Sequence, residues 1–160
     1  MHDIHPCGIP ILDFGSQTAQ RIARRVREAG AYAVLVGPGI TADELRAMQP
    51  KGIILSGGPA SVYADGAPRC DPAILELGVP VLGICYGMQF ASQVRGATIE
   101  RAERREFGRA ALTIDKRDGV LAGIPARPTV WMSHGDHVSA LGDAGLAVVA
   151  TTPSCPPAVV

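Results

Sequence analysis

The first two thirds of the chain alternate between short apolar runs and segments with helical spacing. Apolar runs occupy residues 8–14, 31–36, 51–55 and 79–82. Between the first two, Ala19, Ile22, Ala23 and Val26 recur every three or four residues, which indicates one buried helix face. Another helical segment, 88–95, follows the last run. This alternation is typical of an α/β fold, in which a mostly parallel sheet is covered by helices on both faces.

Residues that favour helix ends support these boundaries. Ser16 is a candidate N-cap for the first helix, and Gly30 would end it. Thr41 and Glu44 have the spacing of a capping box, which predicts a short helix that runs to about Gln49. Each predicted helix therefore begins soon after a predicted strand.

The last third has a different pattern. Residues 110–114, 129–132 and 146–150 read as strands separated by turns, with little helix between them. We expect antiparallel strands added near the edge of the parallel sheet. At 160 residues, with 47% hydrophobic residues, the chain can bury one sizeable core, so we expect a single domain over residues 1–160.

Charge and cysteine content exclude several classes of function. Fifteen basic residues balance fifteen acidic ones, which argues against binding to nucleic acid or to an anionic membrane surface. The arginines within 100–109 alternate with glutamates, as on a solvated face. The four cysteines show no C-x-x-C spacing, so we expect neither a metal site nor a disulfide framework. The amino terminus lacks a secretory pattern, and no apolar stretch is long enough to span a bilayer, so we expect a cytoplasmic protein.

Cys85 is the strongest candidate for a catalytic residue. It lies between Gly83 and Gly87, where an apolar run meets a helical segment, and this spacing has the form of a nucleophile elbow with a thiol in place of the hydroxyl. The N-terminus of the following helix would favour the thiolate. The alternative is a small cysteine packed in the core, and the paired glycines favour the elbow.

The loops that follow the strands should meet at the carboxyl edge of a parallel sheet. They cover residues 14–17, 56–61 and 85–89. The N–H groups of Gly58 and Tyr86 could then form an oxyanion hole beside Cys85, although a Gly-Gly pair can also mark an ordinary tight turn. Gln89, one helical turn after Cys85, could reach the same cleft or could face solvent. No phosphate-binding glycine motif is present.

A cysteine nucleophile usually works with a histidine base and a carboxylate. By spacing alone, the candidates are His134 or His137 with Asp136, and the alternative is a polar turn after the strand at Trp131.

Taken together, the motifs resemble the amidotransferase domain of the GMP synthases, a branch of the class I glutamine amidotransferases. The resemblance runs in order along nearly the whole chain and is carried by residues 11–17, 54–59, 78–89, 105–108 and 130–136. The glycine-flanked cysteine indicates the class, and the segments 13–17 and 131–136 indicate the branch. It implies a flavodoxin-like α/β fold.

The resemblance also implies a reaction. Cys85 would attack the side-chain amide of glutamine to give a glutamyl thioester and ammonia, with Gly58 and Tyr86 as the oxyanion hole. Gln89 and the segment Ser133, His134, Gly135 and Asp136 would hold the glutamine. The domain itself would need no cofactor. Ammonia would pass to an ATP pyrophosphatase domain or subunit, which would use ATP and Mg²⁺ to aminate XMP to GMP, in an enzyme that could be a homodimer.

The chain departs from the family pattern at two places. The family's base and carboxylate lie in a His-Pro-Glu segment downstream of the stretch that matches 154–156, so we expect an incomplete domain with low glutaminase activity, and the resemblance argues against His134 as the base. Thr18 and Ala19 stand where the family usually carries a tyrosine. Two alternatives stay open: a non-catalytic module that senses glutamine or docks on a synthetase, and an amidotransferase serving CTP or anthranilate synthesis.

Overall fold

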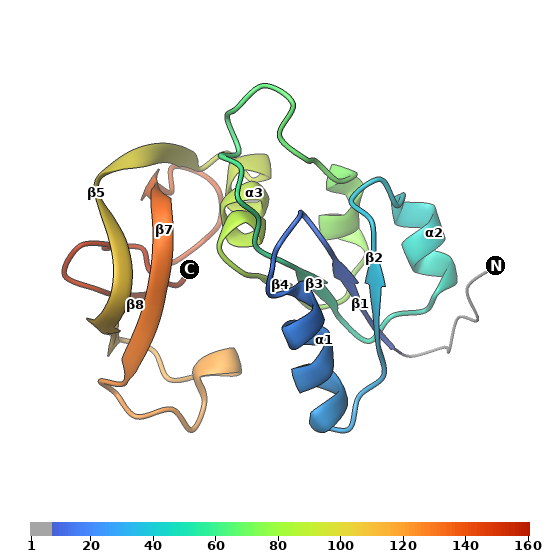
Figure 1. The fold of residues 1–160 in the computed structure, drawn as a ribbon, viewed down its shortest axis with the longest axis horizontal. Coiled ribbons are helices and arrows are strands. Elements are labelled where there is room, and N and C mark those ends of the chain that lie inside the picture. Colours follow the sequence, from blue (N-terminus) through green and yellow to red (C-terminus); the bar gives the residue numbers. More distant parts are fainter. Residues whose placement is uncertain (1–7) are drawn as a thin grey trace. The chain divides into compact units, whose positions relative to one another are not determined.

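The structure is a computed structural model that describes residues 8–160, with the backbone alone for residues 103–106. It consists of two compact units, residues 1–94 and 95–160. The first unit contains the predicted parallel sheet, and its four strands lie in the order β2-β1-β3-β4 (Figure 1). The strands are β1 (Ile9–Leu12), β2 (Ala33–Val36), β3 (Ile53–Leu55) and β4 (Val81–Gly83). All three pairings are parallel.

The connections place helices on both faces of this sheet. The helices are α1 (Ala19–Glu28), α2 (Ala42–Ala47), the 3-10 helix η1 (Pro72–Glu76) and α3 (Tyr86–Val94). The chain moves in one direction from β1 to β2 and in the other from β2 to β3, so right-handed crossovers put α1 and α2 on opposite faces. Ala23 of α1 packs with Ile11 and Ile54 of the sheet. The direction of the connections reverses between β1 and β3, and in open parallel sheets ligands usually bind beyond the carboxyl ends of the two strands at such a point.

The ends of the helices agree in part with the sequence. The capping box is confirmed: the Thr41 hydroxyl accepts a hydrogen bond from the Glu44 N–H, and the Glu44 carboxylate accepts one from the Thr41 N–H. Gly30 follows α1 with φ +86°. The prediction of Ser16 as N-cap is wrong, because its hydroxyl accepts from the Thr18 N–H within a turn and α1 begins at Ala19.

The second unit contains the antiparallel strands. β5 (Thr98–Ala111) pairs with β7 (Thr129–Ala140), and β6 (Thr113–Ile114) pairs with β8 (Ala150–Thr151). A short 3-10 helix, η2 (Gly119–Leu121), lies between β6 and β7. The predicted antiparallel arrangement of the last third is confirmed, and within residues 8–160 these strands form two two-stranded sheets of their own.

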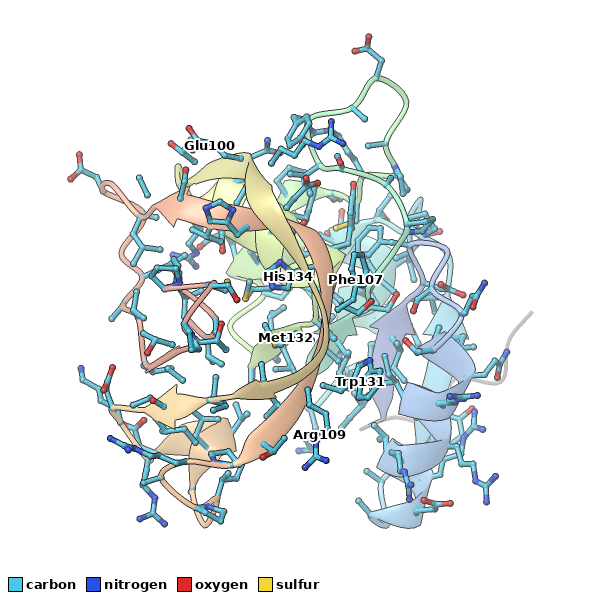
Figure 2. All side chains as sticks on the ribbon, turned by 60° about the vertical axis from the view of Figure 1, so that its left-hand side comes forward. Glu100, Phe107, Arg109, Trp131, Met132 and His134 are labelled. Atoms are coloured by element: carbon cyan, nitrogen blue, oxygen red, sulfur yellow. The ribbon has the colours of Figure 1, made fainter. Side chains whose placement is uncertain are left out.

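The β5–β7 pair is longer than the sequence suggested. It places the segment Ser133 to His137 inside a strand, so the polar turn considered for it is wrong. Side chains of this pair are labelled in Figure 2, and two of them, Phe107 and Trp131, are 65% and 75% exposed. Leu112, Ile114, Leu121 and Ala150 form a small core for the shorter sheet. Among residues 8–160, no helix has the length and apolar character needed to cross a membrane.

Candidate active site

Cys85 occupies the sharp junction between β4 and α3. Its φ is +52°, in the left-handed region that residues other than glycine rarely adopt, and Cys85 is exposed. Two backbone hydrogen bonds hold the junction against β3. The N–H of Ile84 donates to the Leu55 carbonyl at 2.9 Å, and the N–H of Gly87 donates to the Ser56 carbonyl at 3.0 Å. The predicted elbow is therefore formed, with the thiol projecting outward.

The two glycines that flank the elbow permit close approach of backbone segments. A Cβ on Gly87 would overlap the carbonyl group and the side chain of Leu55. A Cβ on Gly83 would lie 2.6 Å from the Cα of Met88. Contacts that short cannot be accommodated without moving backbone, so both positions require glycine.

Three loops meet at Cys85, as the parallel sheet predicts. A Cβ built on Gly57 would lie 3.6 Å from the Cβ of Cys85 and 3.7 Å from the Ser16 hydroxyl oxygen. A Cβ on Gly58 would lie 2.6 Å from the Phe14 carbonyl oxygen. The loops after β1, β3 and β4 thus approach one another closely. The Gly57-Gly58 pair allows this approach, which an ordinary surface turn would not require.

Two amide groups at this place have unused hydrogen-bonding capacity. In the part of the chain that the structure describes, neither the Gly58 N–H nor the Tyr86 N–H donates a hydrogen bond to another group of the protein. The N–H of Gly87, by contrast, is occupied by Ser56. Unused donors beside a candidate nucleophile are the feature expected of an oxyanion hole.

The side chain of Tyr86 anchors the start of α3. Its hydroxyl donates to the Pro68 carbonyl, and its ring packs on that of Phe14 with the centroids 5.1 Å apart. Phe14 also contacts Phe90, one turn further along α3, at 5.9 Å. Burial raises the pKa of the Tyr86 hydroxyl, so it stays neutral and keeps its proton for Pro68. The hydrogen bond to Pro68 and the ring contact with Phe14 therefore fix the position of Tyr86 and, with it, the position of its backbone N–H.

Gln89 lies on the buried face of α3. Its backbone N–H donates to the Cys85 carbonyl at 3.0 Å, and the residue is only 4% exposed. The alternative of an exposed helix residue is therefore wrong. Its proposed contact with a substrate stays a prediction.

The described cysteines differ in accessibility. Cys70 and Cys155 are buried, and Cys85 is exposed. Burial raises the pKa of the Cys70 thiol to about 11, which makes it a poor nucleophile at neutral pH. Cys7 lies outside the described residues.

Ser133, His134, Gly135 and Asp136 lie on β7, in the second unit. His134 is paired with Glu106 of β5 and Asp136 with Arg101. The Nδ1 atom of His134 lies 3.1 Å from the Asp136 carbonyl oxygen, a contact within the same strand. The role of this segment in holding a substrate stays a prediction.

Ser56 was not singled out from the sequence as a functional residue. Its side chain is completely buried and its hydroxyl joins two of the three loops, since it donates to the Gly57 carbonyl and accepts from the Phe14 N–H. A small polar residue directly before a Gly-Gly pair, at the end of a buried strand, was the available signal.

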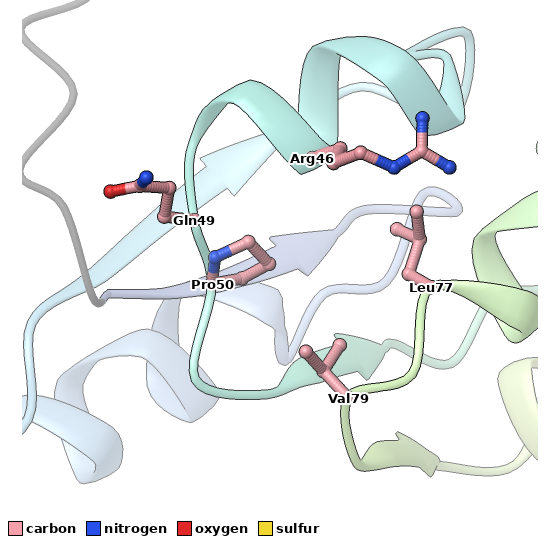
Figure 3. A pocket seen from close by; sticks show the side chains of 5 residues that line it. All are labelled: Arg46, Gln49, Pro50, Leu77 and Val79. Carbon is pink, nitrogen blue, oxygen red and sulfur yellow. The ribbon is translucent and has the colours of Figure 1, made fainter.

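Other parts of the described chain offer less. Among residues 8–160, no three His, Cys, Asp or Glu side chains are grouped as metal ligands. A hollow of about 150 Å³ lies between Arg46, Gln49, Pro50, Leu77 and Val79 (Figure 3). Pro50 and Val79 precede β3 and β4, so this hollow lies at the amino ends of the strands, at the opposite edge of the sheet from Cys85.

Solved structures of other proteins share this fold. A chain from Thermoplasma acidophilum, described as a GMP synthase subunit, superposes with a TM-score of 0.80 at 28% identity, over 96% of this chain and 76% of that one. A glutamine amidotransferase from Thermotoga maritima shares the fold, with a TM-score of 0.73 at 19% identity over 96% of this chain and 70% of that one.

Sequence relatives are closer. The chain is 53% identical over 148 residues to the GMP synthase (glutamine-hydrolyzing) of Bacillus cereus strain AH820 and to that of Bacillus anthracis. Each match covers 92% of this chain and 29% of the relative, so the chain spans less than a third of the length of these relatives. The sequence pattern described as "Glutamine amidotransferase class-I" matches residues 10–159. The chain belongs to the class I glutamine amidotransferase family.

Proposed function

We propose that this chain is the glutamine-hydrolysing part of a GMP synthase and that Cys85 is its nucleophile. The observation that carries the proposal is the exposed thiol of Cys85 at a strained strand-to-helix junction, next to the unused N–H groups of Gly58 and Tyr86. The identity of 53% to GMP synthases supports the choice of branch over amidotransferases that serve CTP or anthranilate synthesis.

In the proposed reaction, the sulfur of Cys85 attacks the carboxamide carbon of glutamine. A carbon–sulfur bond forms, and the carbonyl oxygen takes up the negative charge, which the N–H groups of Gly58 and Tyr86 would stabilise. Removal of one such donor typically costs about 3 kcal/mol of transition-state stabilisation. The carbon–nitrogen bond then breaks as the amide nitrogen takes the proton that the Cys85 thiol gave up, so that ammonia leaves. Water hydrolyses the thioester to glutamate and restores the thiol of Cys85.

The remaining groups follow from the family resemblance. Gln89 and the segment from Ser133 to Asp136 would bind the amino-acid part of glutamine. The partner would be an ATP pyrophosphatase domain or subunit, which would bind ATP and Mg²⁺, and the complete enzyme could be a homodimer. We place its action in the cytoplasm, without a nucleic-acid or membrane partner.

Ammonia release from glutamine tests the proposal. We expect the 160-residue chain to release ammonia slowly, since the family resemblance assigns the base to a segment other than these residues, and a site without one triad member typically keeps a residual rate several orders of magnitude lower. Cys85→Ala should remove this residual rate, and Cys155→Ala, a control at a buried cysteine, should retain it. Equal release by the wild type and Cys85→Ala would refute the proposal. Turnover at a full enzymatic rate would instead assign the base to His134 or His137.

A further inference from the structure

We propose that Ser56 is a positioning residue for the oxyanion hole. Its hydroxyl would fix the orientation of the peptide between Gly57 and Gly58, so that the Gly58 N–H faces the reacting oxygen. This inference rests on the function proposed above and adds a residue that acts through the backbone and does not touch the substrate.

The hydroxyl, the backbone N–H and the carbonyl of Ser56 all make hydrogen bonds. It is completely buried, and its hydroxyl donates to the Gly57 carbonyl at 2.9 Å while it accepts from the Phe14 N–H at 3.2 Å. Its backbone N–H donates to the Leu12 carbonyl at 3.0 Å, and its carbonyl accepts from Gly87 at 3.0 Å. These contacts tie the residue to β1, to the loop after β1 and to the start of α3.

The contact with the Gly57 carbonyl determines where the Gly58 N–H points. The peptide is trans, since none of the described peptide bonds is cis, so its C=O and N–H point in opposite directions. The carbonyl points toward the buried hydroxyl of Ser56. The Gly58 N–H therefore points away from the Ser56 hydroxyl, to the opposite side of the peptide.

This peptide needs such a restraint because both of its residues are glycine. Glycine carries no Cβ, so rotation of the peptide plane meets little steric resistance. The glycines cannot simply be replaced by stiffer residues, because a Cβ on Gly58 would lie 2.6 Å from the Phe14 carbonyl oxygen. Within residues 8–160, the contact from Ser56 is the one intramolecular hydrogen bond that this peptide makes. After a flip, the carbonyl oxygen would face the developing negative charge and repel it.

An aldehyde analogue of glutamine separates this role from a merely structural one. The γ-semialdehyde of glutamate should react with Cys85 to form a thiohemiacetal. The sulfur bonds to the aldehyde carbon, the C=O π bond breaks, and the former carbonyl oxygen takes the thiol proton and occupies the oxyanion hole. Its affinity can be measured by the concentration that slows alkylation of Cys85 by iodoacetamide. Protection by glutamine itself, in the same assay, reports ground-state binding.

The matched variants are Ser56→Ala and Ser61→Ala. Each removes one serine hydroxyl, and the two positions lie on the same loop. Ser56→Ala should weaken aldehyde binding by about 10- to 100-fold, in line with loss of an oxyanion donor, and leave protection by glutamine within about twofold. Ser61→Ala should leave both unchanged.

Equal aldehyde affinity in Ser56→Ala and the wild type would overturn the inference while leaving the proposed function intact. Parallel loss of aldehyde and glutamine binding in Ser56→Ala would also overturn it, because it would indicate general damage to the loop. Failure of the wild type to form the thiohemiacetal at Cys85 would overturn the proposed function, and this inference with it.

Discussion

Replacement of Cys85 by glycine should stabilise the protein relative to replacement by alanine. Both variants lack the thiol, so they lose the same sulfur contacts. They differ only in the Cβ atom, which sits on a backbone with φ +52°. Gln49, with φ +49°, is the other non-glycine residue with positive φ among residues 8–160.

The expected difference follows from two opposing effects. A Cβ in the left-handed region costs about 1–2 kcal/mol relative to glycine. The greater entropy of glycine in the unfolded chain offsets this by about 0.4–1 kcal/mol. We therefore expect Cys85→Gly to be more stable than Cys85→Ala by about 0.8 kcal/mol, the difference between the midpoints of these two ranges. At an ordinary helical position the sign would be reversed, since glycine there costs about 1 kcal/mol relative to alanine.

Urea unfolding followed by far-UV circular dichroism measures this difference. Circular dichroism is preferable to fluorescence because the single tryptophan, Trp131, lies in the second unit. Gln49→Gly and Gln49→Ala serve as a matched pair at the end of α2 and should show the same sign. If Cys85→Gly is equal to or less stable than Cys85→Ala while the Gln49 pair behaves as expected, the elbow is not strained and the reasoning is refuted.

Three further predictions concern the surroundings of the elbow. Gly87→Ala should destabilise the protein by about 3 kcal/mol or prevent folding, because the added Cβ would overlap Leu55. Gly37→Ala, where the added Cβ has open space around it, should not destabilise the protein. Urea unfolding of both variants checks this, and equal stabilities would contradict it. The Asp71 carboxylate accepts hydrogen bonds from the Ala42 and Ala73 N–H groups, which lower its pKa. The contribution of the Asp71 carboxylate to stability is therefore present above the unfolded pKa and is lost as the pH falls through the lower folded pKa. The stability difference between wild type and Asp71→Asn, measured by urea unfolding, should shrink below about pH 4. A difference that is constant down to pH 2 would count against this. In native protein, iodoacetamide should label Cys85 well before Cys70, whose buried thiol has a pKa of about 11, and peptide mass spectrometry would expose the opposite order.

The sequence predicted well those features that local chemistry determines. The capping box at Thr41 and the elbow at Cys85 depend on residues within a few positions of one another, and both are present in the structure. The meeting of the three loops was also predictable, because the carboxyl ends of parallel strands share one edge.

Features that depend on a competing local turn or on distant contacts were missed. Ser16 looked like an N-cap, but Asp13 accepts hydrogen bonds from the Gly15 and Ser16 N–H groups and delays the helix to Ala19. The strand through Ser133 to His137 is polar enough to resemble a turn, and pairing with β5 keeps it extended. The burial of Ser56 and Gln89 likewise depends on loops and faces that no local pattern encodes.

The most direct test of the account is selective labelling of Cys85 by a diazo-ketone analogue of glutamine. For each cysteine, the rate of labelling by the analogue is divided by the rate of labelling by iodoacetamide. We expect this ratio to be far higher for Cys85 than for any other cysteine, and we expect free glutamine to protect Cys85 from the analogue. Labelling at the same relative rate for all cysteines, or labelling of Cys85 that glutamine does not slow, would show that no glutamine site surrounds this thiol and would contradict the account.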